Sequence, residues 1–509
     1  MEGSTTSTHA KPADAVCLTP KRMENSVSSE HKLPVEIWRQ IFLEACFWSH
    51  EGSRLGRRDQ HRPIELGGNV SPPFPLQISR ACSFWRKIVF DYPILWSCIS
   101  LRLQPICRDD SVLLTAFSFV LEKSCKYPLS LEISANRARP REWTNGFITS
   151  LKPLMFQALA QSTDLEIQLD IFQSIIIETP LHFPLLQKFT ITETRLMTDT
   201  TVRSQRVHDI RMLLHDVPAL TSVALNSLAW PVIRSFSPYN SVKPLLDFFP
   251  SLNHLHLRVI RYNIPVVISS PVIFPHLQNL TIQDEDVIPD LGTLIKAFNT
   301  PSLSQFALTT PGCRTRDHHL GSSLVQCLRQ SGCNLQTLRI SAPNTSLSSD
   351  PYWILDVVDL SPELRTLHLE FCAPKESDAT AVVVNVMLNT VVYRLYSSLS
   401  DSPAPMLPLL STLTVRIYKF PIGKSWNSTT RDIATSFLHM VESRADSNAS
   451  LRHAELVISH SFHNHRSGGM PAGNVEGVEE LEAFHVDLAR RCESLLVNYG
   501  VTVDLDIPR

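Results

Sequence analysis

Several features typical of nucleotide-binding, secreted and membrane proteins are scarce in this chain of 509 residues. It has only 16 glycines, which argues against a glycine-rich nucleotide-binding fold. Its 11 cysteines are odd in number and form no Cys-x-x-Cys pair, which excludes a disulfide framework and a structural zinc site. No apolar run approaches the roughly 18 residues of a membrane helix, and the polar start lacks the apolar core of a signal peptide. We therefore expect a cytoplasmic or nuclear protein with free thiols.

The composition that is present is globular, with 43% hydrophobic and 19% charged residues. The length suggests two or three domains. A formal net charge of -2 provides no basic field, so neither nucleic acid nor an anionic membrane is an expected partner. The 35 prolines indicate frequent breaks between short elements.

Regular structure is expected to begin at Leu33, after a polar, Ser/Thr-rich segment 1–31 that predicts a disordered tail. Pro34 suits a first helical turn, and an amphipathic helix is predicted from there to Cys46. Its apolar positions form one bulky stripe: Ile37, Trp38, Ile41, Phe42 and Ala45.

A segment rich in Arg, Gly and Pro, residues 50–75, lacks periodicity and is interpreted as a flexible insertion. The helical pattern returns at Leu76, and apolar residues at spacings of four, three and four predict one helix up to Phe90. Pro93–Trp96 predicts a short helical turn, and Cys98–Leu103 alternates as a strand.

These segments resemble the F-box family, in the form with a long insertion found in many fungal proteins. The resemblance lies in the Leu33-Pro34 pair that opens the first helix, in Cys82-Ser83-Phe84-Trp85-Arg86-Lys87, and in Pro93-Ile94-Leu95-Trp96. It covers about 65 residues, and the insertion departs from the compact family pattern. The alternative is an ordinary helical hairpin that caps the following domain.

The rest of the chain contains a recurring octet, Pro-x-Leu-x-x-Leu-x-Leu, in which other apolar residues can replace the later leucines and one copy lacks the proline. Its leading leucines are Leu186, Leu220, Leu252, Leu277, Leu303, Leu335, Leu364 and Leu410, with a degenerate copy at 451–456. The steps range from 25 to 46 residues, so the array is irregular compared with a standard leucine-rich repeat. The alternating apolar pair at the end of each octet predicts a short strand with one buried face. Amphipathic helices are predicted between octets, for example around 291–298, 320–328 and 433–441.

The expected fold class is therefore α/β (α+β overall). We expect a helical F-box over 32–100 and an irregular leucine-rich-repeat-like solenoid with parallel strands over 101–509. A helix over 478–495 and a strand over 501–507 are expected to cap its end.

Motifs for catalysis or metal binding are weak. His460, His463 and His465 have ligand-like spacing, but no carboxylate or cysteine nearby completes a metal site. The glycine-rich segment 468–473 lacks the Lys-[Ser/Thr] of a P-loop. No nucleophile elbow, His-Glu-x-x-His motif or kinase signature occurs. We expect no cofactor, no metal and no catalytic residue.

The resemblance implies a substrate-recognition adaptor of an SCF-type (cullin-RING) ubiquitin ligase, in which the F-box binds the linker protein and, through it, a cullin. The residues that the resemblance assigns to this contact are Leu33, Pro34, Ile37, Ile41 and Ile78. A protein target is expected on the polar strand positions between the leucines: Lys188, Thr190, His254, His256, Asn279, Thr281, Arg339, Thr366, His368 and Thr412. The alternatives are a protein-interaction scaffold outside any ligase and an enzyme with an unrecognised site.

Overall fold

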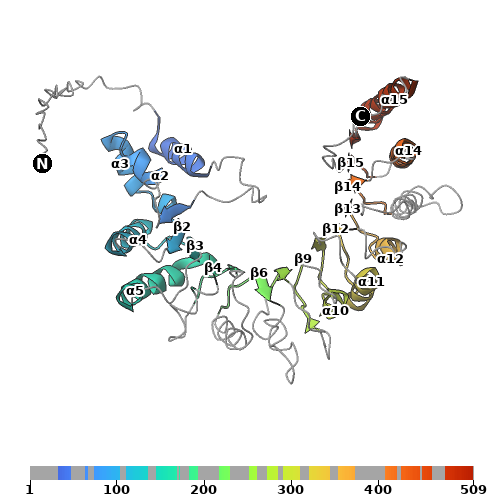
Figure 1. The fold of residues 1–509 in the computed structure, drawn as a ribbon. Helices are drawn as coiled ribbons and strands as arrows, with labels where there is room; N and C mark the ends of the chain where they lie inside the picture. Colours follow the sequence, from blue (N-terminus) through green and yellow to red (C-terminus); the bar gives the residue numbers. More distant parts are fainter. Residues whose placement is uncertain are drawn as a thin grey trace, which may run out of the picture.

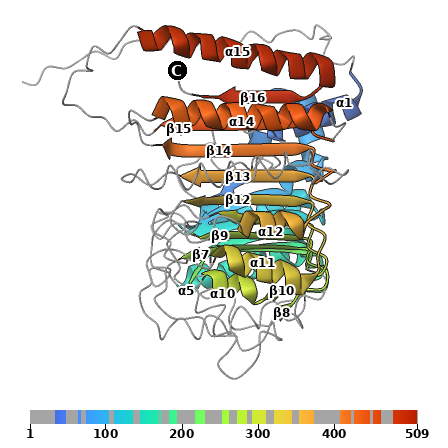
Figure 2. The same cartoon turned by 90° about the vertical axis from the view of Figure 1, so that its right-hand side faces the viewer.

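The computed structural model has a mixed α/β fold that is built on one long parallel sheet. It describes residues 33–47, 63–66, 74–103, 110–135, 145–168, 171, 183–192, 217–229, 252–260, 272–284, 291–309, 320–343, 353–372, 407–420, 426–446, 450–460 and 476–507. The sheet curves into an open arch, with helices on its convex side and strands along its concave side (Figures 1 and 2). The predicted tail 1–31 lies outside the described residues.

Within the described part of the chain, the main sheet contains 14 strands, which all pair in parallel with their neighbours. The strands follow one another across the sheet in chain order. They are β1 (Ile64–Leu66), β2 (Cys98–Leu103), β3 (Leu129–Ala135), β4 (Ser162–Gln168), β5 (Lys188–Thr192), β6 (Ser222–Ala229), β7 (His254–Ile260), β9 (Asn279–Asp284), β11 (Gln305–Thr309), β12 (Thr337–Pro343), β13 (Thr366–Cys372), β14 (Thr412–Phe420), β15 (His453–His460) and β16 (Thr502–Asp506). The short strands β8 (Val272–Ile273) and β10 (Phe298–Asn299) pair with each other outside this sheet.

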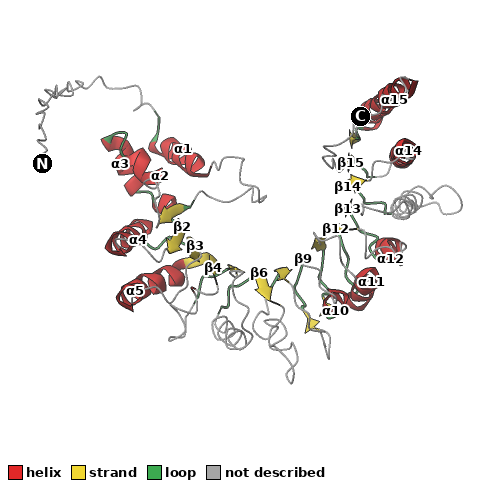
Figure 3. Ribbon diagram, viewed as in Figure 1, coloured by secondary structure: helices red, strands yellow, loops and turns green. Residues whose placement is uncertain are grey.

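Helices connect many of these strands along the outside of the arch (Figure 3). The described helices are α1 (Val35–Phe47), α2 (Phe74–Ser79), α3 (Ser83–Phe90), the 3₁₀ turn η2 (Pro93–Trp96), α4 (Asp110–Ser124), α5 (Asn145–Gln161), α10 (Leu291–Lys296), α11 (Leu320–Ser331), α12 (Trp353–Asp359), α14 (Trp426–Asp446) and α15 (Glu476–Tyr499). A helix between successive strands is the usual way to join parallel neighbours, because the chain must return to the same end of the sheet.

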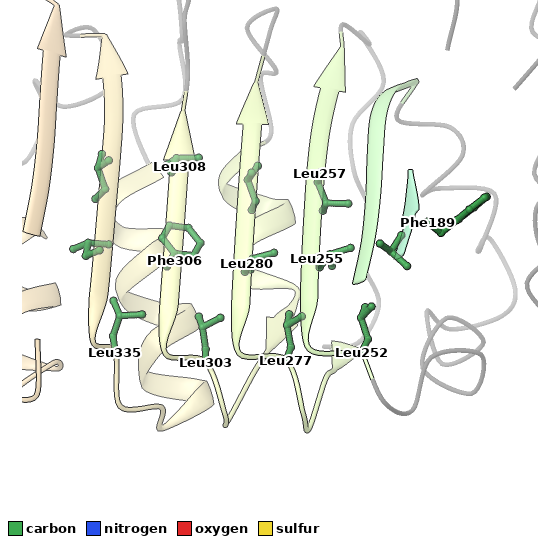
Figure 4. Close-up of a cluster of buried hydrophobic side chains, with 14 of the residues drawn as sticks. Phe189, Leu252, Leu255, Leu257, Leu277, Leu280, Leu303, Phe306, Leu308 and Leu335 are labelled. Carbon is green, nitrogen blue, oxygen red and sulfur yellow. The ribbon is translucent and has the colours of Figure 1, made fainter. Parts of the chain in front are cut away.

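The octets explain the core. All eight leading leucines are at most 1% exposed, and the alternating apolar residues that follow them are also buried wherever the structure describes their side chains. Figure 4 shows this stacking, in which Leu252, Leu277, Leu303 and Leu335 form one row beneath the strand residues. The strands predicted from every octet, including the degenerate one at β15, are confirmed.

A repeated hydrogen-bond pattern fixes the register between neighbouring units. The N–H groups of Thr221 and Ser222 both donate to the carbonyl of Gln187, at 2.9 and 3.0 Å. The same pair of bonds recurs one unit later, from Asn253 and His254 to the carbonyl of Thr221. The turn at each octet therefore donates hydrogen bonds to a carbonyl of the preceding turn. A shift of one strand by one residue relative to its neighbour would break these bonds.

The N-terminal region differs from the prediction in two places. The segment 50–75 was expected to lack regular structure, but Ile64–Leu66 form strand β1, because the buried Ile64 and Leu66 alternate around a solvent-facing Glu65. The single helix expected up to Phe90 is two helices, α2 and α3. The two helices are separated at Cys82, which has an extended backbone. As the N-cap of α3, Cys82 accepts the N–H of Trp85 on its Sγ.

The N-terminal helices and the sheet share one hydrophobic core. Trp96 is fully buried and donates its indole N–H to the carbonyl of Val89 in α3, at 2.8 Å. Its ring stacks with Phe90 and meets Phe119 of α4 edge to face. The helical segment therefore packs directly against the first units of the sheet.

Candidate functional site

The first candidate surface is helix α1, whose two faces have different environments. On the inner face, Trp38 and Phe42 pack against Trp85 of α3, with ring centroids 5.1 and 5.2 Å from that of Trp85. Phe42 is only 3% exposed. These aromatic residues hold α1 on α3, with Phe42 buried and the two tryptophans partly buried.

Three exposed aliphatic side chains occur at intervals of four residues, two on the outer face of α1 and one just before the helix. Leu33, Ile37 and Ile41, hereafter the α1 stripe, are 43%, 46% and 41% exposed. Four-residue spacing places Ile37 and Ile41 along one side of α1, whereas Leu33 lies two residues before the helix begins. Pro34 is also exposed, and its carbonyl accepts the N–H of Trp38 at the helix start. The sequence placed inner and outer residues in a single stripe, and the structure separates them.

Ile78, the fifth residue that the resemblance assigned to the linker contact, has a different position. It lies in α2, is partly buried and packs against the core. The polar surroundings of the α1 stripe include a hydrogen bond from Gln40 Nε2 to Glu44 Oε1, at 2.9 Å on the exposed side of the helix. The guanidinium of Arg39 lies over the Tyr92 ring, 5.3 Å from its centroid, so this cation also joins α1 to the turn before η2.

The second candidate surface is the concave face of the sheet. The ten predicted target-binding residues all occupy strand positions that point away from the buried leucines. Register places five of them in each of two rows. Lys188, His254, Asn279, Thr366 and Thr412 lie in the first row, and Thr190, His256, Thr281, Arg339 and His368 in the second. The sheet thus brings them to one surface, with Lys188, His254 and Arg339 the most exposed.

Contacts within this face join neighbouring strands. Asn279 Nδ2 and His254 Nδ1 are in hydrogen-bond contact at 2.6 Å, between β9 and β7. In β13, His368 Nε2 lies 3.5 Å from Glu370 Oε2, and this contact lowers the pKa of the Glu370 carboxyl below its ordinary value.

Sequence reasoning missed several charged residues on the same face. Arg416 of β14 donates from Nη2 to Glu455 Oε1 of β15 at 2.7 Å. Glu132 and Glu166 occupy corresponding positions in β3 and β4. Strand alternation also applies to these positions. Glu132 and Glu166, however, lie in strands that precede the first octet, so the octets did not identify them.

His, Cys, Asp and Glu side chains, which supply metal ligands and nucleophiles, are spread over the described residues. No group of three His, Cys, Asp or Glu residues among them could hold a metal ion. The side chains of the His460, His463 and His465 motif and the segment 468–473 lie outside the part of the chain that the structure describes. Burial raises the pKa of the thiols of Cys98 and Cys327 to about 12, which disfavours the nucleophilic thiolate. Of the described helices, none is long and apolar enough to cross a bilayer.

Comparisons with known proteins do not assign this chain to a family. No family model matches this chain. No curated protein matches it either. Among solved structures, it is similar to a protein from Bacteroides fragilis determined by a structural genomics consortium, with 13% sequence identity and a TM-score of 0.30. That match covers 64% of this chain and 66% of the Bacteroides protein, and the likeness is too distant to bear on function.

Proposed function

We propose that this chain is a substrate-recognition adaptor of an SCF-type ubiquitin ligase. In this proposal, residues 32–100 form an F-box that docks to the linker protein, and residues 101–509 form a leucine-rich-repeat-like solenoid that holds a protein target on its concave face. The observation that carries the proposal is the α1 stripe, because its three aliphatic side chains remain exposed just before and along one side of a helix whose other side packs against Trp85. Exposed apolar residues at helical spacing are typical of a helix that docks to a partner.

The mechanism requires no chemistry from this chain. The linker protein and cullin would hold the adaptor near a charged ubiquitin-conjugating enzyme, and the concave face would hold the target. The acceptor lysine then reacts faster because its effective concentration near the thioester is high. The shared core around Trp96 supports this arrangement, since a rigid connection fixes the direction in which the concave face points.

The same two surfaces suit a protein-interaction scaffold outside any ligase. This alternative predicts a partner on the α1 stripe other than the linker protein. Binding of the purified linker protein to the full chain distinguishes the two proposals.

Substitution of the α1 stripe tests the adaptor proposal directly. Truncating Ile37 and Ile41 to alanine removes two side chains that are nearly half exposed, and each should contribute roughly 1.5 kcal/mol when buried. The double variant is expected to bind the linker protein about 100-fold more weakly by isothermal titration calorimetry. A double variant of two exposed valines elsewhere, Val112→Ala and Val486→Ala, is the matched control and should bind normally. Equal loss in both variants, or loss in neither, would contradict this use of the stripe.

A further inference from the structure

The last strand of the described sheet, β16, lies beside helix α15 at the C-terminal end of the arch (Figure 2). The edge of β16 that faces away from β15, hereafter the free edge, has no paired strand among the described residues. Among the described residues, β16 pairs only with β15. The N–H of Thr502 points to that neighbour and donates to the carbonyl of Arg452 at 2.9 Å. Since hydrogen-bonding groups alternate along a strand, the N–H and C=O groups of Val503 and Leu505 point to the free edge. Such an edge is a template for another strand.

The two faces of β16 present different chemistry along this edge. On the helix side, Val503 and Leu505 are only partly buried although they pack against the core. The last turn of α15 adds two strongly exposed side chains, Leu496 at 53% and Val497 at 75%.

The opposite, concave side of β16 is acidic. Asp504 and Asp506 are both exposed, and the side chain of Asp504 is 65% exposed. A histidine of β15, His453, contacts Asp504 at 3.9 Å between Nδ1 and Oδ2. An added strand would therefore meet carboxylates on one face and aliphatic side chains on the other.

We propose that the free edge of β16 is a strand-addition site for an extended partner segment in which basic and apolar side chains alternate. The partner backbone would pair with the free groups of Val503 and Leu505. Its basic side chains would lie opposite the two aspartates, and its apolar side chains would extend the row of Val503 and Leu505. Main-chain bonds would supply the binding and the alternating side chains the specificity. This site is at the other end of the arch from the α1 stripe and does not depend on the proposed function.

The same charges reject a second copy of this edge. Antiparallel pairing of two β16 strands would bring four aspartates together on one face, and like charges on facing strands are destabilising. The aspartates therefore contribute to selectivity, because they attract basic strands and disfavour acidic ones. The chain itself is expected to stay monomeric through this edge.

The test uses the full chain and two capped seven-residue peptides, one alternating lysine with valine and the other glutamate with valine. Binding is measured by fluorescence anisotropy of the labelled peptides, and hydrogen exchange reports protection of segment 501–507. The lysine peptide should bind at least about tenfold more tightly than the glutamate peptide and should slow exchange in that segment.

Two variants separate edge pairing from general attraction of a cationic peptide. Leu505→Pro removes an N–H from the free edge and leaves the bonds to β15 in place, so peptide binding should be lost while the fold persists. The double charge reversal Asp504→Lys and Asp506→Lys should invert the preference between the two peptides. The proposal is overturned if neither peptide slows exchange, if both bind equally, or if Leu505→Pro binds as well as the native chain. Sedimentation as a dimer with a protected β16 would also overturn it, in favour of self-association.

Discussion

The two faces of α1 should respond very differently to truncation, and Phe42 and Ile37 provide the comparison. Phe42 is 3% exposed and its ring contacts those of Trp38 and Trp85, so Phe42→Ala leaves a cavity in the aromatic cluster. Truncation of a buried phenylalanine typically costs about 3–5 kcal/mol. Ile37 is 46% exposed, and Ile37→Ala is expected to change stability by no more than about 0.5 kcal/mol, partly because alanine is the better helix former.

Hydrogen exchange of the α1 amides measures this difference locally. The cost at Phe42 corresponds to a loss of protection of about 200-fold to several thousandfold, whereas Ile37→Ala should leave the protection nearly unchanged. If Ile37→Ala exposes α1 as much as Phe42→Ala does, the stripe belongs to the core and the docking surface does not exist as described.

Two further predictions concern the packing between helices and the cysteines. Gly321→Ala should lower the thermal midpoint, at a cost of about 1–3 kcal/mol, because the new Cβ would overlap the Trp353 ring. Gly146→Ala in α5 is the control, since its Cβ meets nothing within 4 Å, and a lowered midpoint there would show that the contact with Trp353 is not the cause. In the native chain at mildly alkaline pH, iodoacetamide should modify the exposed Cys125 but not Cys327, whose pKa is raised by burial to about 12. Rapid modification of Cys327, detected by mass spectrometry, would mean that α11 opens readily.

The repeated octets made most of the sheet predictable from the sequence. Each leading leucine and the alternating pair after it report the same burial in unit after unit, so tertiary packing reinforces the local pattern. Strands such as β9 and β13 therefore lie where the octets placed them.

Short elements outside the repeats were harder to predict from the sequence. β1 has only three residues within a segment rich in Arg, Gly and Pro, and it forms because β2 offers an edge with which to pair. The separation of α2 from α3 depends on the N-cap at Cys82, and a cysteine cap has no strong sequence signature. Helix α5 contains Pro153, which argues against a helix when the sequence is considered alone.

The candidate surfaces were also only partly predictable from the sequence. The sequence assigned Ile37 and Trp38 to one apolar stripe, because a helix with 3.6 residues per turn places adjacent residues only about 100° apart. The position of Trp85 determines that Trp38 packs against α3 while Ile37 stays exposed. The concave residues were easier to identify, because strand alternation leaves just two faces.

We propose that the α1 stripe docks this chain to a ubiquitin-ligase core. The most direct test of this proposal is titration of the unmodified full chain with the purified linker–cullin pair, followed by size-exclusion chromatography with mass detection. The adaptor proposal predicts a saturable one-to-one complex that elutes as a single species. If no complex forms, the adaptor proposal is contradicted, and α1 to α3 instead serve as a cap of the sheet or as a docking site for another protein.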